Sequence, residues 1–240
     1  GKDKAKAELE ILRAKLEAQQ SMFYADGRHK LLVVLQAMDT AGKDSTIRMV
    51  FDGMNPQGVK VANFKAPTAE ELAHDFLWRV HAKTPAYGEI VIFNRSHYED
   101  VLITRVNGWI DEKTCKTRYV AINAFEQLLA DNGTTILKFY LHISKDEQKQ
   151  RLIERQQDPT KQWKFNPDDL KSRAQWEDYM AAYSQAIAAT STARAPWYVV
   201  PAISKLQRNL IVSTVICDTL ESLKLAYPKP LLGIEKIKVE

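Results

Sequence analysis

The stretch LLVVLQAMDTAGKDSTI, residues 31–47, indicates both a fold class and a chemistry. An apolar run, residues 31–35, leads into a turn with one glycine, one lysine and several hydroxyl side chains. The Walker A pattern G-x-x-x-x-G-K-[ST] has this form, and its backbone N–H groups and helix N-terminus hold phosphate oxygens. Here Ala37 replaces the first glycine and Asp44 replaces the hydroxyl residue. The stretch therefore predicts a strand, a phosphate-binding loop and a helix over residues 45–54, but does not say which phosphate is bound.

Four further runs have strand character, because they are rich in apolar, β-branched or aromatic residues. They cover residues 59–64, 90–93, 135–141 and 198–200, with segments of helical length between them. Strands that alternate with helices form right-handed crossovers and a parallel sheet covered on both faces. The sequence thus predicts an α/β fold with a five-stranded parallel sheet, in a single domain over residues 1–240. Ligands of such sheets bind beyond the carboxyl ends of the strands.

The composition is that of a globular chain with a mild positive charge. The 240 residues are 45% hydrophobic, and 34 Lys and Arg against 30 Asp and Glu give a net charge of +4. This excess suits an anionic ligand but is too small to indicate nucleic acid as a partner. Cys115 and Cys217 lack C-x-x-C or zinc-type spacing, which disfavours a disulfide framework and favours the cytoplasm. No apolar stretch reaches the roughly 20 residues that cross a bilayer, so no membrane partner is expected.

The N-terminal segment, residues 1–25, has the pattern of an amphipathic helix. Leu9, Leu12, Leu16 and Phe23 recur at spacings of three, four and seven, which places them on one face, and the alternative is a helix on a membrane surface. We expect this helix to pack on the domain or on a second subunit. The predicted assembly is a homo-oligomer, either a dimer or a tetramer.

Two helix starts frame an insertion between the fourth and fifth strand runs. Ser144 and Glu147 form a capping-box pattern, and Asn166 is followed by a proline and two aspartates, as at the start of a helix. The polar loop QQDPTKQWKF, residues 156–165, joins the two helices. We expect residues 145–190 to form a helical lid.

The loop after the first strand supplies candidate phosphate ligands. They are Thr40, Ala41, Gly42, Lys43, Asp44, Ser45 and Thr46. A carboxylate in such a loop repels polyanions unless a divalent cation stands between, so we interpret Asp39 as a magnesium ligand or as a base. The alternatives are an ordinary strand-to-helix turn with a solvated Lys43, and an aspartate that only accepts backbone N–H groups.

The second strand ends at the same rim of the sheet, in Asn63, Phe64 and Lys65. Phe64 could stack on a base while Lys65 meets a phosphate. The alternative for Phe64 is a place in the core, which is common for an aromatic residue at a strand end.

The third strand is followed by Asn94 and Arg95, and the planar guanidinium of Arg95 suits a phosphate. Glu99 and Asp100 follow about one helical turn later, where an aspartate can reach back to a metal ion at the strand end. A solvated helix face is the alternative for both carboxylates.

The lid is rich in cations, namely Arg151, Arg155, Lys161, Lys164 and Arg173. Arg151 and Arg155 are four residues apart and share one helix face. However, residues 145–175 hold eight Lys or Arg against six Asp or Glu, a net of only +2. A solvated charged helix therefore explains the pattern as well as a clamp for a polyanion does.

Several stretches together resemble the polyphosphate kinase-2 family, the polyphosphate:nucleotide phosphotransferases. They are AMDTAGKDSTI, NFKAPTAEELAHDFLWRVH, GEIVIFNRSHYEDVL and WKFNPDDLKSRAQWEDYMAAYSQAIAATSTARAPWYVVPA, and the likeness covers roughly residues 20–225. The resemblance implies a P-loop kinase-like three-layer sandwich with a helical lid. It also implies transfer of the terminal phosphoryl group of inorganic polyphosphate to a nucleotide, with Mg²⁺ as the cofactor and Mn²⁺ as a second candidate.

The resemblance also suggests roles for residues. The catalytic set is Asp39, Lys43, Arg95, Asp100 and Arg155, with Asp39 and Asp100 as metal ligands. Polyphosphate is assigned to residues 40–46 with Arg155, Lys161, Lys164 and Arg173, and the nucleotide to Asn63, Phe64, Lys65, Asn94, Arg95 and Tyr98. The text NRSHYED, residues 94–100, looks like the subgroup that phosphorylates both AMP and ADP, giving ADP and ATP. The alternatives are an ATP-dependent nucleoside monophosphate kinase and a non-catalytic nucleotide-binding P-loop protein.

Overall fold

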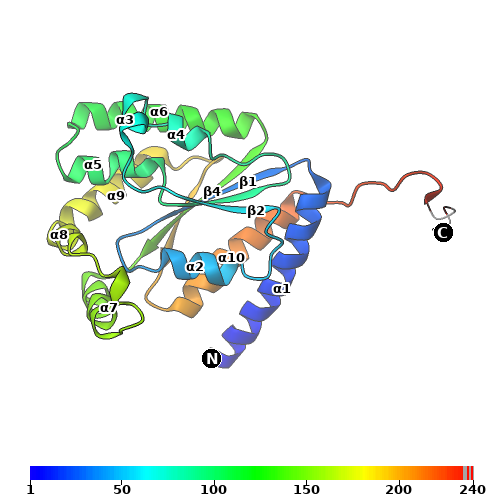
Figure 1. The fold of residues 1–240 in the computed structure, drawn as a ribbon, viewed down its shortest axis with the longest axis horizontal. Coiled ribbons are helices and arrows are strands. Elements are labelled where there is room, and N and C mark those ends of the chain that lie inside the picture. The colour runs from blue at the N-terminus through cyan, green and yellow to red at the C-terminus, as the bar shows by residue number, and fades with distance from the viewer. Residues whose placement is uncertain (235–236, 238, 240) are drawn as a thin grey trace.

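The structure, a computed structural model that describes residues 1–234, 237 and 239, is built on a sheet of five parallel strands (Figure 1). The strands are β1 (Lys30–Gln36), β2 (Val59–Asn63), β3 (Ile90–Asn94), β4 (Thr134–His142) and β5 (Trp197–Pro201), in the spatial order β2-β3-β1-β4-β5. Each coincides with a strand run predicted from the sequence, to within one residue at either end. The predicted α/β class with a five-stranded parallel sheet is therefore confirmed.

The centre of the sheet is its most deeply buried part. Strand β1 lies between β3 and β4, where Leu31 pairs with Ile90 on one side and with Thr135 on the other. Every residue of β1 after Lys30 is buried. A continuous apolar run is expected of a strand that is covered on both faces, whereas the edge strands β2 and β5 remain partly exposed.

Helices on both faces of the sheet make three layers (Figure 1). One face carries α1 (Lys2–Asp26), α2 (Lys43–Val50) and α10 (Lys205–Ser222), and the other carries α5 (Ile103–Val106), α6 (Glu112–Asp131) and α9 (Trp176–Thr190). The shorter elements are α3 (Ala69–Ala73), α4 (Trp78–His81), η1 (His97–Val101), α7 (Lys145–Gln157), η2 (Gln162–Lys164) and α8 (Asp168–Ala174). The predicted three-layer sandwich is therefore present.

The N-terminal helix α1 packs along α10 of the same chain. Of the predicted face it buries Leu9, Leu16 and Phe23, whereas Leu12 is partly buried. Gln19 Nε2 also donates to the Cys217 carbonyl oxygen at 3.3 Å. The domain itself thus provides a partner for this helix.

The ends of some helices differ from the prediction. Helix α2 begins at Lys43, two residues before the predicted start, and ends at Val50, where Phe51 leaves the helical conformation; Gly53, with a φ of 80°, excludes the predicted end at residue 54. Ser144 Oγ accepts from Glu147 N at 3.1 Å, but the Glu147 carboxylate accepts from Arg151 instead of completing the capping box. Helix α8 begins at Asp168, one residue later than Asn166-Pro167 suggests.

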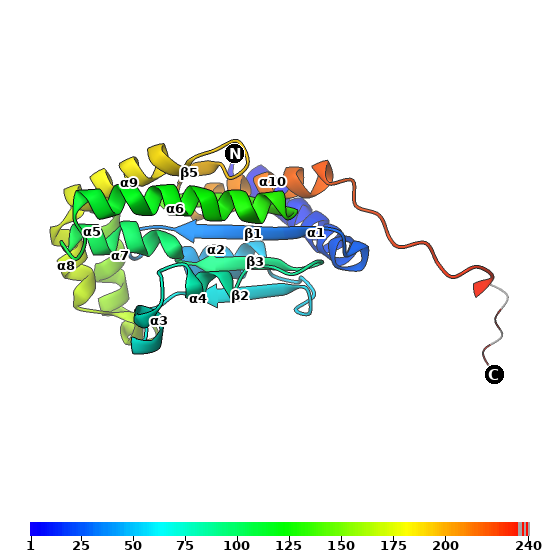
Figure 2. The same cartoon turned by 90° about the horizontal axis from the view of Figure 1, so that it is seen from above.

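The fold places the carboxyl ends of the strands under α7 and α8 (Figures 1 and 2). After β1 the chain enters α2 on one face of the sheet, and after β3 it enters α5 and α6 on the opposite face. The crevice between β1 and β3 is therefore the topological switch point, where sheets of this kind bind ligands. Among the described residues, none of the helices combines the length and apolar composition that spanning a bilayer requires.

Candidate active site

The loop between β1 and α2, residues 37–42, curls around the amino group of Lys43. Lys43 Nζ donates to the Ala37 carbonyl oxygen at 2.9 Å. Burial lowers the pKa of Lys43, although Asp39 opposes that shift. Thr40 and Gly42 have φ values of 65° and 103°, so a non-glycine residue of the loop is held in the left-handed region. Such strain gathers at functional sites, and here it opens the start of α2, with its free N–H groups, toward the cavity.

The end of β3 faces this loop across the crevice. Arg95 Nη2 donates to Asp39 Oδ1 at 3.3 Å, which joins the two candidate catalytic residues directly. Arg95 also has a left-handed backbone, with φ of 62°. Burial tends to lower the pKa of Arg95, but Glu99 and Asp39 outweigh it, and the pKa lies above its ordinary value. The crevice therefore contains a fixed cation beside a carboxylate.

A buried guanidinium supports the loop from below. Arg208 of α10 is 1% exposed, and its Nη2 donates to Ser45 Oγ at 3.1 Å and to Asn209 Oδ1 at 2.9 Å. A Cβ at Gly42 would overlap this guanidinium, so the glycine allows the loop and Arg208 to pack together. No carboxylate pairs with Arg208 among the described residues. Burial, followed by Arg151, lowers the pKa of Arg208 to about 10.

Sequence reasoning missed Arg208, since it lies far from every motif in the sequence. Only the packing of α10 against α2 brings it to the loop. A buried cation without a counter-ion is costly, so an anionic ligand in the cavity is its natural partner.

These groups line a cavity of about 1230 Å³ that lies between the loop and the lid. Of the residues predicted from the sequence, it contains Asp39, Thr40, Gly42, Lys43, Asp44, Ser45, Asn63, Phe64, Lys65, Asn94, Arg95, Arg155, Lys161 and Lys164. It also contains Arg48, Arg151, Lys205 and Arg208, which were not assigned to the site from the sequence. The cavity thus brings together most of the predicted residues and surrounds them with positive charge.

Three predicted phosphate ligands do not reach the cavity wall. Ala41 and Thr46 are fully buried, and their N–H groups are already donated to the Met38 and Gly42 carbonyl oxygens. Arg173 lies behind α7, where it donates to the Lys145 carbonyl oxygen. Their roles are corrected to support of the loop and the lid.

The nucleotide assignment of Tyr98 is also wrong. Tyr98 is fully buried, and its hydroxyl donates to Glu126 Oε1 at 2.8 Å on the α6 side of the sheet. Phe64 is intermediate between the two predicted roles, since it packs edge-to-face on Phe93 at 4.9 Å yet keeps an edge at the cavity.

The structure does not bring Asp100 to Asp39 as a second metal ligand. Asp100 Oδ1 lies 3.7 Å from Arg118 Nη1, and Asp100 is not part of the cavity wall. The reason is that the chain after β3 forms the 3₁₀ helix η1, with about three residues per turn, rather than an α-helix. Glu99 is not part of the cavity wall either, but it lies within electrostatic reach of the crevice: burial raises the pKa of Glu99, and the charges of Arg95 and Lys43 oppose that rise.

The lid contacts the loop through several polar groups. Arg151 Nη1 donates to the Thr40 carbonyl oxygen at 3.1 Å, and Gln148 Nε2 donates to that of Asp39 at 3.2 Å. Farther out, Lys164 Nζ lies 3.8 Å from Asp44 Oδ2. The first part of α7 is therefore fixed to the loop, while the lysines near η2 reach over it from an exposed segment.

Arg155 is held within the lid by a buried carboxylate. Its Nη1 donates to Asp169 Oδ2 and to the Lys164 carbonyl oxygen, both at 3.2 Å. Burial, followed by the charge of Asp39, raises the pKa of Asp169 to about 6. Asp169 thus places a titratable negative charge at the edge of a cationic cavity.

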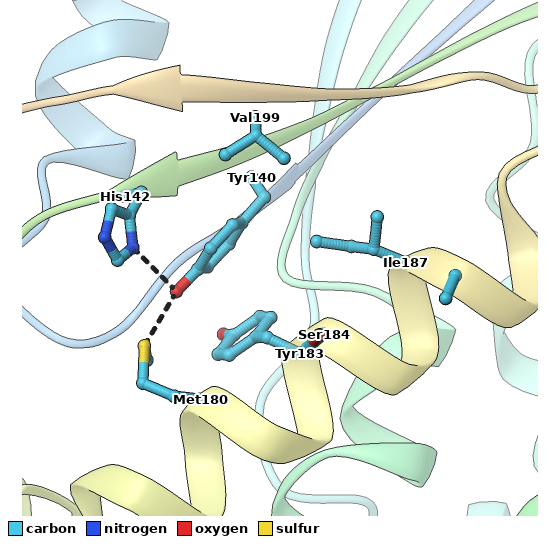
Figure 3. Close-up of a pocket in the computed structure, with 8 residues that line it drawn as sticks. Tyr140, His142, Met180, Tyr183, Ser184, Ile187 and Val199 are labelled. Carbon is cyan, nitrogen blue, oxygen red and sulfur yellow. Dashed lines mark hydrogen bonds between the residues drawn. The ribbon is translucent and has the colours of Figure 1, made fainter.

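A second, smaller hollow of about 350 Å³ lies between α9 and the β4–β5 edge of the sheet (Figure 3). Tyr140 stacks on Tyr183 with ring centroids 4.3 Å apart, and Tyr140 Oη donates to Met180 Sδ at 3.5 Å. Its lining includes no lysine or arginine. It therefore lacks the charge that a phosphate ligand requires.

The larger cavity fits magnesium that arrives with phosphates, rather than a metal ion held only by protein. Within the part of the chain that the structure describes, no three His, Cys, Asp or Glu side chains form a metal-binding group. Mg²⁺ is commonly bound by one or two carboxylates together with substrate phosphates and water. Asp39 supplies such a carboxylate, and the Thr40 hydroxyl beside it is buried without a hydrogen-bond partner. The arrangement can hold phosphate chains and their counter-ion.

Comparisons with known proteins agree with this chemistry. The family model described as Polyphosphate kinase 2 (PPK2) matches residues 1–228. The AMP/ADP-polyphosphate phosphotransferase of Meiothermus ruber is 55% identical over all of this chain and 90% of its own length. The ADP-polyphosphate phosphotransferase of Rhodopseudomonas palustris is 47% identical over 92% of this chain and 81% of its own length. The crystal structure of polyphosphate kinase 2 from Arthrobacter aurescens TC1 superposes with a TM-score of 0.96, at 48% identity, over 98% of this chain and 85% of that one.

Proposed function

The chain belongs to the polyphosphate kinase 2 family of phosphotransferases, and we propose that it transfers the terminal phosphoryl group of inorganic polyphosphate to AMP and ADP. The observation that carries this proposal is the single cavity that combines the loop of Lys43 and Asp39 with Arg95, Arg208 and the cationic lid. A long polyanion needs positive charge on several sides, and this cavity supplies it from both sheet and lid.

In phosphoryl transfer the protein mainly positions the two substrates and stabilises the charge of the transferring group, and no covalent enzyme intermediate is needed. The N–H groups at the start of α2 and the Lys43 amino group hold the end of the donor chain. Arg95 binds the acceptor phosphate and sets it in line with the donor. Arg155, carried by α7, covers the transferring group when the lid, residues 145–190, closes.

The proposed cofactor is Mg²⁺, with Mn²⁺ as a second ion of the same coordination chemistry. Asp39 would hold it, and Glu99, rather than Asp100, is the further carboxylate that acts electrostatically on the same crevice. When bound, the ion neutralises phosphate charge during transfer. Asp39 also orients Arg95 through their hydrogen bond.

The use of both AMP and ADP rests on two supports. The segment NRSHYED, residues 94–100, has the pattern associated with dual acceptance, and the Meiothermus ruber relative carries both nucleotides in its name. Asn94, the first residue of this segment, lines the cavity. Its Nδ2 donates to Asp44 Oδ1 at 2.9 Å and to Asn63 Oδ1 at 2.8 Å. These side chains are proposed to contact the acceptor nucleotide, together with Phe64 and Lys65.

We further propose that the chain forms one domain that includes the lid, and that two or four chains assemble into a homo-oligomer. The proposed location is the cytoplasm. The two cysteines are free and buried, which suits a reducing compartment. Light scattering on the purified protein measures the number of chains, and hydrogen exchange of residues 145–190 with and without polyphosphate measures the closing of the lid.

The reaction is tested by supplying one donor at a time. The protein is incubated with Mg²⁺ and either AMP or ADP, with polyphosphate or ATP as the donor, and the nucleotides are separated by ion-exchange chromatography. We expect ADP from AMP, and ATP from ADP, with polyphosphate alone. Product from AMP with ATP alone would instead indicate a nucleoside monophosphate kinase, and no product with either donor would indicate a non-catalytic nucleotide-binding protein.

A further inference from the structure

A network of buried polar side chains lies on the α6 side of the sheet, directly after Arg95. Lys138 Nζ on β4 donates to Glu126 Oε2 at 2.5 Å, to the Tyr98 hydroxyl at 2.9 Å and to the Thr190 carbonyl oxygen at 2.8 Å. The Tyr98 hydroxyl in turn donates to Glu126 Oε1 at 2.8 Å. All four residues are at most 2% exposed. None of them lines the cavity, so the network does not bind the substrates directly.

Stability alone does not explain why this network is charged. Taking a lysine and a glutamate out of water is expensive, and a well-packed apolar pair of similar volume is often as stable or more stable. What a fully bonded buried network provides is a single geometry for the elements it joins.

The network joins the end of the catalytic strand to the end of the lid. Tyr98 belongs to η1, three residues after Arg95, and Thr190 is the last residue of α9. Trp197 Nε1 on β5 donates to Thr190 Oγ1 at 3.0 Å, which extends the same frame to the edge of the sheet. One ammonium group thus contacts η1, α6 and α9 directly, and β5 through Thr190.

The segment that this frame holds is strained. Arg95 has φ of 62°, an unfavourable conformation for a residue with a side chain, and such conformations persist only where the surroundings fix them. On the sheet side, Arg95 N donates to the Leu35 carbonyl oxygen at 3.1 Å, and Gln36 Nε2 donates to Ser96 Oγ at 3.1 Å. On the far side, the next fixed points are His97, whose Nε2 lies 3.1 Å from Glu126 Oε1, and the Tyr98 hydroxyl, which donates to the same carboxylate oxygen.

The geometry points to the Glu126–Lys138 pair, acting through Tyr98, as a positioning device that fixes Arg95 beside the phosphate loop. This inference rests on the proposed function, because it assigns Arg95 to the acceptor phosphate. Loss of the Tyr98 hydroxyl leaves His97 as the remaining side-chain contact of η1 with Glu126, which loosens η1 and moves the Arg95 guanidinium away from Asp39. The phosphate loop and the lid lysines keep their own contacts and continue to hold polyphosphate.

The test is a double-mutant cycle between Tyr98→Phe and Arg95→Ala, measured as kcat and KM for each substrate. Tyr98→Phe keeps the ring and removes only the hydroxyl. Tyr140→Phe is the matched control, since Tyr140 is also buried, lies two residues after Lys138 on the same face of β4, and bonds Met180 at the second hollow (Figure 3). A second variant, Glu126→Gln with Lys138→Met, removes both charges together so that neither is left alone in the core.

We expect Tyr98→Phe and the charge-free variant to lower kcat by about 10-fold to 100-fold, as small displacements of reacting groups do. KM for polyphosphate should change little, and Tyr140→Phe should retain the wild-type kcat with a similar thermal midpoint. In a protein that already carries Arg95→Ala, adding Tyr98→Phe should lower kcat by less than about 2-fold, because the effects of coupled residues are not additive.

Two results would overturn the inference. One is additive losses from Tyr98→Phe and Arg95→Ala, and the other is a loss in Tyr140→Phe equal to that in Tyr98→Phe. Failure of the proposed function is a separate result, seen as no transfer from polyphosphate by the wild-type protein. In that case the same cycle is measured on AMP binding by calorimetry, where additive effects again contradict the inference.

Discussion

The floor of the cavity, residues 37–45 with Arg95 and Arg208, and the lid, residues 145–190, carry similar charges in opposite surroundings. On the floor, Lys43 and Arg208 are enclosed by loop carbonyl and side-chain oxygens. In the lid, Lys161 and Lys164 are exposed and pair with acidic side chains that solvent also reaches. Electrostatic interactions of buried, fixed charges are strong, whereas those of exposed charges are weakened by water and salt. The floor should therefore determine the chemistry and the lid the strength of binding.

The largest effect is expected from the floor. Lys43→Ala and Asp39→Asn should each lower kcat by about 100-fold to 1000-fold, as does the loss of other groups that stabilise transition-state charge. Circular dichroism and the thermal midpoint should show that the fold is intact. Lys60→Ala is the control, because Lys60 pairs with Glu89 outside the cavity. Near wild-type turnover in either floor variant would remove that residue from the mechanism.

The second prediction concerns the buried cation. Arg208→Met should lower kcat/KM for polyphosphate by about 10-fold to 100-fold, the range for a hydrogen-bonded charge. It should also raise the thermal midpoint of the ligand-free protein by about 2–4 °C, because it removes a buried charge that has no counter-ion.

Arg208→Lys sharpens this prediction, since it keeps the charge but not the planar fork that reaches Ser45 and Asn209 together. We expect it to recover part of the lost kcat/KM. The midpoint and initial rates are measured on all three proteins in parallel. A lower midpoint for Arg208→Met would show that Arg208 supports the fold instead of serving the ligand.

The third prediction tests the lid. Lys161→Ala with Lys164→Ala should weaken polyphosphate binding by several-fold at low salt. The loss should be much smaller near 0.5 M salt, where exposed charges are screened over about 4 Å. Turnover at saturating polyphosphate should stay near the wild-type value. Lys171→Ala is the matched control, because Lys171 is an exposed lysine of α8 outside the cavity. Binding is measured by calorimetry at both salt concentrations, and a salt-independent loss would place these lysines among the fixed contacts.

The strands and the phosphate loop could be predicted from the sequence because their signals are local. A continuous apolar run before a glycine and a lysine predicts a strand, a loop and a place for Lys43 at the start of the next helix, and the structure has all three. Asp100, Tyr98 and Arg208 could not be assigned correctly in the same way. The first two depend on a 3₁₀ turn after β3 that shifts each side chain around the helix axis, and Arg208 depends on the packing of α10 against α2.

The smallest effect concerns Asp169, a buried acid in a lid of mostly exposed charges. The unfolded chain releases the Asp169 proton near its ordinary pKa of 3.8, whereas the folded protein keeps it to about pH 6. Between these values the folded state binds more protons, so the free energy of unfolding falls as pH rises, by on the order of 1 kcal/mol from this residue. Asp169→Asn should remove that fall, so its stability relative to the wild type should increase from pH 4 to pH 6 and then level off. Urea unfolding at half-unit pH intervals measures this, with the exposed neighbour variant Asp168→Asn as the control. If the two variants follow the same pH dependence, the Arg155 ion pair cancels the effect of burial, and Asp169 loses its proton in the folded protein as readily as in the unfolded chain.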